Sequence, residues 1–257
     1  MTITRSRPEV ARGIGTSPRR SDGVPKVEGS FSYVSDLNHE DMLWAATLRS
    51  PHPSALIKSL DVSRATALAG VAAVLTQAEV PGRPTFGLEH PDQPVMCDGT
   101  ARYWGEPIAI VAAADLATAR RAIETIELEM EELEPLSDPE QADLEGSVYR
   151  RMRIRTGDPD RRGPVVVEGY YEVGMQDQAP LGPEAGLAIP DGMGGVDLYA
   201  TSQFLHVDHE QIVACLGLQP DQVRCHPPGM GGAFGAREDV NLHIHLCWLA
   251  LQTGRPV

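Results

Sequence analysis

The sequence predicts an α+β protein of two domains. Over residues 106–133 an apolar run, an amphipathic segment and an alternating segment follow one another, which indicates a strand, a helix and a strand. Residues 134–164 are rich in proline, glycine and charge, as connections between domains are. Further strand and helix patterns follow this connection, and a chain of 257 residues is long enough for two modest domains.

The first domain is predicted to follow an extended arm. Residues 1–26 combine Gly, Pro, Ser and Arg without any periodicity. After the arm, alternating and β-branched patterns predict strands over 42–50 and 55–63. A short helix that ends near Gly70 and a strand directly after it come next.

An amphipathic helix and an acidic strand complete the first domain. Asp115 precedes the helix over 115–126 and suits its N-cap. Residues 126–133 have a helix-favouring composition, but apolar residues and glutamates alternate strictly, and this period of two predicts a strand with one wet face. We therefore expect the acidic stretch 124–145 to be a solvated strand edge and linker, not a metal site.

The second domain is predicted to hold two helices and several strands. The strands are expected over 164–173, 194–202 and 223–226. The first helix is predicted to begin at Asp208, whose spacing to Gln211 matches a capping box, and to end at Gly217. The second is predicted to follow Asp239 as its cap and to stop near Gly254, although its first residues also alternate as in a strand.

The charge balance argues against a nucleic-acid partner. The formal net charge is −14, whereas a protein that binds nucleic-acid phosphates needs a basic face. The arginines of the arm have no aromatic or helical pattern beside them, which indicates a solvated arm. No apolar run of about 18 residues occurs, and no apolar segment follows Arg19 and Arg20, so we expect a cytoplasmic protein without a membrane span.

Cysteines and histidines form no recognisable metal site in the sequence. The four cysteines lack C-x-x-C spacing, which excludes a self-contained zinc ribbon or iron–sulfur cluster. Cys215 and Cys247 lie in apolar periodic runs and are expected in the core. Two histidine pairs lack a matching carboxylate and are expected to be surface or packing residues. These pairs are His206 with His209 and His243 with His245.

The stretch GMGGAFGARED, residues 229–239, carries the strongest functional signal. Phe234 stands where a dinucleotide-binding G-x-G-x-x-G motif needs glycine, and the stretch lacks the lysine of a P-loop. Glycines at this density indicate a tight connection or a backbone that approaches a ligand, and the central Phe234 favours the ligand. Glu184 and Gln203 are single polar residues beside strands and indicate nothing by themselves.

Four motifs in a fixed order resemble one protein family. They begin YWGEPIAIV, VEGYYEVGMQ, YATSQFLHVD and GMGGAFGARED, over residues 103–142, 167–188, 199–218 and 229–239. Together with the opening stretch 13–37, they resemble the molybdenum-binding subunit of the xanthine dehydrogenase and aldehyde oxidase family. The likeness is greatest to bacterial xanthine dehydrogenases with separate subunits, and it covers nearly the whole chain.

The resemblance implies a domain arrangement. An α/β-hammerhead domain would span 27–142, a linker would span 143–164, and the N-terminal part of a molybdopterin-binding domain would span 165–257. The arm would then end at residue 26.

The resemblance also implies roles for single residues. Gly232, Phe234 and Gly235 would bring the glycine loop against the molybdenum cofactor. Gln203 would lie beside the molybdenum oxo group, and Glu238 would hydrogen-bond the substrate. No residue of this sequence matches the family's general base, and none would bind molybdenum directly, because the metal is held through its cofactor.

The implied reaction is hydroxylation of a purine such as hypoxanthine or xanthine at an electron-poor carbon. Electrons would leave through iron–sulfur clusters and FAD. Because the cysteine spacing here cannot hold those clusters, an iron–sulfur subunit and an FAD subunit are expected as partners.

The sequence departs from the family pattern in two ways. Ala233, Ala236 and Arg237 stand where the family commonly has glycine, glycine and lysine. An alanine at 236 would cost about 1 kcal/mol if its φ were positive. The sequence also stops at TGRPV, which is early in the family's second domain. The alternative expectation is therefore a truncated or split-gene chain that holds no cofactor alone and needs a C-terminal molybdopterin-domain chain.

Overall fold

The computed structural model describes residues 14–240 and 242–257. Its first part is built on two antiparallel three-stranded sheets. In the first sheet, β7 (Pro107–Ala113) lies between β1 (Trp44–Arg49) and β3 (Val71–Thr76), and every residue of β7 is buried. In the second sheet, β2 (Ala55–Asp61) lies between β6 (Thr100–Ala101) and β8 (Glu127–Glu132).

Short elements connect these sheets. Helix α2 (Ser63–Thr66) ends before Gly70, whose φ is +91°, and β3 follows as predicted. Helix α3 (Leu116–Glu124) packs against β1 and β7, and its predicted cap is confirmed, because Thr118 N donates to Asp115 Oδ1 at 2.7 Å. A two-stranded hairpin joins β4 (Thr85–Phe86) to β5 (Gln93–Pro94).

The acidic segment 127–132 is a strand, as its period of two predicts. Glu127, Glu129 and Glu131 are exposed, while Leu128 and Met130 turn inward against β2. Lys58 and Arg64 form ion pairs with this exposed face. A helix over the same residues would have placed glutamates among the apolar contacts, so the alternation overrides the helix-favouring composition.

The second part contains a mixed three-stranded sheet and two helices. β10 (Val196–Ala200) pairs antiparallel with β9 (Gly186–Pro190) and parallel with β11 (Val223–His226). Helix α5 (Leu205–Leu216) runs between β10 and β11, and α6 (His243–Thr253) packs on β9 and β10.

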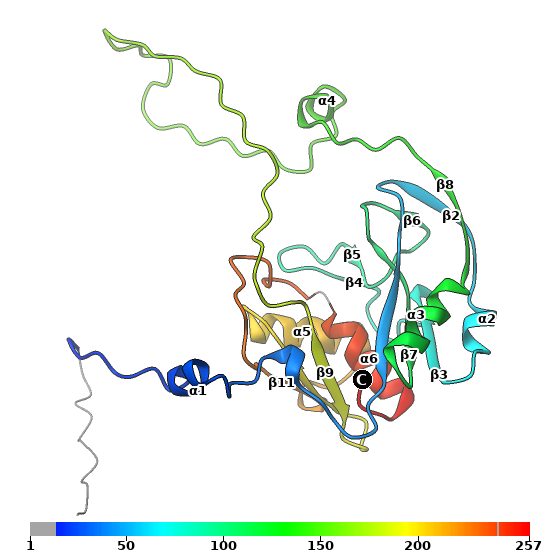
Figure 1. Cartoon of the computed structure of the whole chain (residues 1–257). Coiled ribbons are helices and arrows are strands. Elements are labelled where there is room, and N and C mark those ends of the chain that lie inside the picture. Colours follow the sequence, from blue (N-terminus) through cyan, green and yellow to red (C-terminus); the bar gives the residue numbers. More distant parts are fainter. Residues whose placement is uncertain (1–13, 241) are drawn as a thin grey trace, which may run out of the picture.

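Helix α6 joins the two parts into one core (Figure 1). Leu246, Cys247, Trp248 and Leu249 are buried in a cluster with residues of β3, β7, β9 and β10. The predicted burial of Cys215 and Cys247 is confirmed, since neither side chain is exposed.

Both helix starts were predicted at the wrong residue, although both ends at glycine are confirmed. Helix α5 begins at Leu205, one turn before Asp208, which is buried inside the helix and caps nothing. Helix α6 begins at His243, so Asp239 does not cap it. The added turn of α5 holds Leu205 and Val207 half-buried, and α6 begins at His243, the first of its run of buried residues. A capping pattern alone is thus weaker than the packing of the helix.

The predicted strand over 164–173 is wrong. Residues 145–185 carry no helix or strand, and most of this segment extends away from the core before residues 181–184 return to it (Figure 1). Val165, Val167 and Tyr171 are each at least 80% exposed. β-branched composition shows that a segment suits a strand, but the strand forms only beside a partner. No described strand pairs with these residues.

The N-terminal arm is described only from residue 14. Helix α1 (Gly23–Glu28) runs past residue 26, the predicted end of the arm, and buries no side chain. A short helix, α4 (Pro139–Leu144), reaches into the predicted linker 143–164 and has Asp138 as its N-cap. After α1 the chain reaches the glycine loop of the second part, because Tyr33 forms a parallel bridge with Gly229.

Candidate functional site

Two glycines of the loop 229–238 are required by the close approach of other backbones. A Cβ on Gly229 would strike the Phe31 ring and would lie 2.7 Å from Ser32 O. A Cβ on Gly231 would lie 2.6 Å from the Cα of Gly182. Because real Cβ atoms do not come this close to backbone, only glycine fits at these two positions. The segments 31–34 and 181–184 therefore hold the loop from two sides.

The centre of the loop has an unusual backbone. Gly232 and Gly235 have φ of +107° and +96°, and between them Phe234 has φ of +58°. A bulky residue in the left-handed region is a strained exception. The Phe234 ring is nevertheless 76% exposed, so burial of the ring does not compensate the strain. Ala236 has no positive φ, and the cost considered for alanine at this position does not arise.

Gln203 ties the loop to the end of β10. Its Oε1 accepts from Gly235 N at 3.0 Å and from Arg237 N at 3.4 Å, and its own backbone N donates to Arg237 O at 2.8 Å. Because the loop engages the amide oxygen, the amide nitrogen remains as the donor that Gln203 can offer to a ligand.

Glu238 lies beside the same turn. A Cβ built on Gly235 would lie 3.8 Å from Glu238 Oε1, and the Glu238 side chain is only half-buried. Its neighbour Asp239 accepts from Leu88 N at 3.1 Å and from Val240 N at 2.8 Å. Since α6 begins at His243, Glu238 is not in the first turn of a helix, and interaction with a helix dipole does not explain a carboxylate there.

The structure thus brings together the residues that the sequence singled out. Gln203, Gly232, Phe234, Gly235 and Glu238 form one turn with its support. Glu184 and Arg237 also belong to this assembly, because Arg237 Nε lies 2.9 Å from Glu184 Oε1. Sequence reasoning gave Arg237 no role, because a single arginine in a loop has no periodicity and its burial is a tertiary property.

The burial of one carboxyl group, that of Asp208, was also missed. Asp208 is 0% exposed, and neither carboxyl oxygen has a well-aligned hydrogen bond, although the nearby Ser202 hydroxyl partly offsets the effect of burial on its pKa. Burial raises the pKa of Asp208 to about 6, and nearby Asp239 contributes in the same direction. The capping pattern had assigned Asp208 to a helix end, where it would be solvated.

The paired histidines of α6 are packing residues, as predicted. His243 Nε2 lies 3.0 Å from Thr201 O, and His245 Nε2 lies 2.8 Å from Val95 O. A carbonyl oxygen only accepts, so each Nε2 carries a proton. Burial lowers the pKa of His245 to about 4, and it lowers the pKa of His243. His209 instead contacts the carbonyls of Pro220 and Val223.

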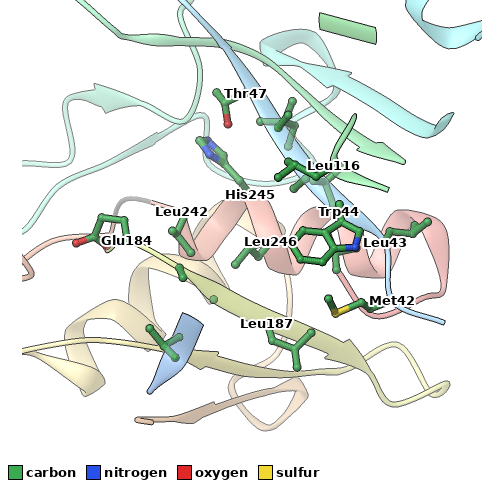
Figure 2. A pocket seen from close by; sticks show the side chains of 18 of the residues that line it. Met42, Leu43, Trp44, Thr47, Leu116, Glu184, Leu187, Leu242, His245 and Leu246 are labelled. Atoms are coloured by element: carbon green, nitrogen blue, oxygen red, sulfur yellow. The ribbon is translucent and has the colours of Figure 1, made fainter. Parts of the chain in front are cut away.

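A groove of about 470 Å³ lies apart from the loop, between β1 and β9 with α6 as its floor (Figure 2). Its walls are mostly apolar, with Met42 and Trp44 toward one end and Glu184 at the other. None of the loop residues 229–238 lines it. The groove meets the loop through Glu184, which pairs with Arg237, and through Val34, whose backbone N donates to Gly229 O at 3.2 Å. Its volume alone does not identify the reaction site.

Two family models together match most of the chain. Residues 28–134 match the a/b hammerhead domain of aldehyde oxidase and xanthine dehydrogenase. Residues 142–257 match the molybdopterin cofactor-binding domain. The chain belongs to the aldehyde oxidase and xanthine dehydrogenase family. The predicted fold, an α/β-hammerhead domain followed by molybdopterin-binding domain sequence, is confirmed. Within residues 14–240 and 242–257, no helix is long and apolar enough to cross a membrane.

Individual relatives agree with this family. The chain is 35% identical over 249 residues to a probable xanthine dehydrogenase subunit of Bacillus subtilis (strain 168), covering 93% of this chain and 33% of the relative. It is 31% identical to the nicotinate dehydrogenase large molybdopterin subunit of Eubacterium barkeri, covering 95% of this chain and 60% of that subunit. The aldehyde oxidoreductase structure from Desulfovibrio gigas superposes with a TM-score of 0.80 at 27% identity, covering 93% of this chain and 29% of that protein. The chain thus spans about a third of the Bacillus relative.

The loop fits a molybdopterin cofactor. Gly232 and Gly235 remove side chains from the turn, and Gln203 offers an amide donor beside it. The exposed Phe234 shows that the outer side of the turn is not filled by the described residues. Backbone without side chains, next to an uncharged donor, suits a large polar group that is recognised through hydrogen bonds.

Proposed function

We propose that this chain forms one wall of the molybdenum site of a hydroxylase that oxidises purines or closely related nitrogen heterocycles. The observation that carries the proposal is the strained, exposed Phe234 at the centre of the glycine loop, with the Glu238 carboxylate beside the same turn. Strain that burial does not compensate is typical of functional sites.

The residues of the loop and its support have different roles in this proposal. Gly232, Phe234 and Gly235 shape the surface that faces the cofactor, and Gln203 donates its amide N–H toward it. The cofactor, when bound, supplies the two-electron oxidation of the substrate carbon. Glu238 accepts a hydrogen bond from a ring N–H of the heterocycle and so orients it. Because a carboxylate can only accept hydrogen bonds, Glu238 favours a substrate with N–H donors. Its negative charge also disfavours an anionic substrate.

The electron-transfer groups belong to partner subunits in this proposal. Three of the four cysteines, Cys97, Cys215 and Cys247, are buried in the described part of the chain. Burial raises the pKa of the Cys97 thiol to about 11, and that of Cys247 is raised as well, which opposes the thiolate that a cluster needs. An iron–sulfur subunit and an FAD subunit would accept the electrons.

The general base also lies outside the assembled residues. Glu238 Oε1 is the carboxylate atom nearest to a Cβ built on Gly235, and the Glu184 carboxylate is already paired with Arg237. A further molybdopterin-domain polypeptide would supply the base and the remaining cofactor contacts. With such a polypeptide as partner, the residues of this chain bind the cofactor and orient the substrate but do not catalyse the reaction by themselves.

Kinetics of the enzyme purified with its native partners test the proposal. We expect molybdenum in the complex and a higher kcat/KM for hypoxanthine or xanthine than for benzaldehyde or nicotinate. Turnover of aldehydes alone would contradict the proposed substrate class. Absence of molybdenum from an intact complex would contradict the proposed site.

A further inference from the structure

We infer that Arg237 is a positioning residue, which fixes the glycine loop against the segment 181–184 with Glu184 as its counter-ion. The inference deepens the proposed function, because it rests on the loop facing the cofactor, and it adds a residue that none of the roles above includes. Arg237 is only 2% exposed, although arginine is rarely buried without a specific set of partners.

The guanidinium of Arg237 bonds in several directions. Nη1 donates to Gly232 O, and Nη2 donates to Gly182 O at 2.6 Å and to Pro183 O at 3.2 Å. Nε pairs with the carboxylate of Glu184 without the alignment of a hydrogen bond. A buried cation is stable only while such partners surround it. The burial of Arg237 therefore requires both segments to keep their places.

The two segments are also built for direct contact. Gly182 and Gly231 face each other so closely that a Cβ on either would strike the backbone of the other. Gly182 N donates to Gly231 O at 3.1 Å, and Gly182 O accepts from Arg237, which lies 55 residues later. Each polar backbone atom of Gly182 is thus bonded to the loop or to its arginine.

This arrangement holds Phe234 from both sides. Arg237 binds the carbonyl of Gly232 before it, and Gln203 binds the amide of Gly235 after it. Left-handed backbone at a bulky residue persists only where its surroundings fix it. Without the bond to Gly232, we expect the turn to relax and Phe234 to leave this conformation.

An uncharged side chain should not replace Arg237, and lysine, which the family commonly has at this position, should replace it only in part. The guanidinium is a planar fork whose donors point in fixed, divergent directions, whereas an ammonium is a point charge on a flexible stem. One ammonium cannot reach Gly232 O on one side and the carbonyls of Gly182 and Pro183 on the other as the fork does.

Hydrogen exchange of the full chain tests the role directly. In Arg237→Gln and Arg237→Met we expect exchange at the bonded amides of Gly182, Gly235 and Ala236 to rise about tenfold or more. Amides in β10 and α5 should keep their protection. Arg224→Met is the matched control, because Arg224 pairs with Asp191 and Asp197 away from the loop and should leave loop exchange unchanged.

Loop protection that persists in Arg237→Met would overturn the inference. If the Arg237 variants lose protection everywhere, Glu184→Gln decides, because it keeps the volume of the side chain and removes only the counter-charge. We expect a rise at the same loop amides in Glu184→Gln, and unchanged loop exchange there would equally overturn the inference.

A second measurement separates positioning from mere stability. In the assembled enzyme, Arg237→Met should lower kcat for a purine and for an aldehyde by the same factor, about tenfold, because the whole loop moves. A loosened loop with unchanged kcat for both substrates would overturn the positioning role. A wild-type complex that is inactive on both substrates would contradict the proposed function instead and would leave the exchange result standing.

Discussion

Close backbone contacts and positive φ angles decide which residues fit in the loop 229–238. Gly231 is needed because another backbone lies where its Cβ would be, whereas Gly232 and Gly235 are needed for their positive φ. Glycine density in the sequence could predict that such constraints exist. It could not separate these two causes, because contact between Gly231 and Gly182 depends on a segment distant in the chain.

The close approach at Gly231 gives a stability prediction. Gly231→Ala should lower the free energy of unfolding by about 1–3 kcal/mol, since the added methyl forces the two backbones apart. Gly174→Ala is the control, because no atom lies within 4 Å of its Cβ position, and it should change stability by less than about 0.5 kcal/mol. Denaturant unfolding measures both, and equal effects would contradict the contact.

Asp208 predicts a pH dependence of stability. Its pKa is about 6 in the folded chain, above the ordinary value of 3.8, so the folded state holds the proton more tightly. The contribution of Asp208 to the free energy of unfolding is therefore greatest below pH 4 and is lost as pH rises from about 4 to 6. The loss approaches about 3 kcal/mol above this range.

Replacing this carboxyl should remove that loss. Asp208→Asn is expected to be more stable than the parent at pH 8, and its unfolding free energy should vary less between pH 4 and pH 7. Urea unfolding at several pH values measures the difference. Parallel pH curves for the variant and the parent would show that Asp208 does not titrate as proposed.

At the scale of elements, patterns of burial are more predictive than capping motifs. Strict alternation identified β8 correctly against its helix-favouring composition. The capping box at Asp208 failed because α5 begins one turn earlier, at Leu205, and Asp208 itself is the first buried residue of the helix. The strand predicted at 164–173 failed because pairing needs a partner that local sequence does not specify.

The two side-chain caps of the first part should differ in importance. Asp115 caps α3, which packs on the central sheet, and Asp115→Ala should cost about 1 kcal/mol. Asp138 caps α4 in the same way, but α4 buries no residue, so Asp138→Ala should leave global unfolding unchanged. Thermal or denaturant unfolding compares the two variants, and a larger loss at Asp138 would contradict this ranking.

At the scale of the whole molecule, the two parts share one core. Val95 and Ile110 from the first part are buried in the same cluster as Trp248 and Leu249 of α6. The extended segment 145–185 connects the parts but contributes little to that core. Composition could predict the connection, whereas the shared core could not be predicted, because nothing in the sequence specifies that α6 packs on β3 and β7.

Limited proteolysis should show this division. Trypsin is expected to cut first among the exposed arginines between 150 and 162. The two fragments should then elute together from a native sizing column, because α6 keeps the common core closed, and should separate only in denaturant. Fragments that part under native conditions would indicate two independent cores.

Glu238→Gln in the assembled enzyme tests most directly whether the carboxylate beside the glycine loop orients the substrate. Glutamine keeps the volume and an acceptor but loses the charge, and a charge-assisted hydrogen bond is worth about 1.5–3 kcal/mol. We predict that kcat/KM for the purine falls by about tenfold or more, while kcat/KM for an aldehyde without the N–H edge changes little. Equal losses on both substrates, or no loss on either, would contradict this role.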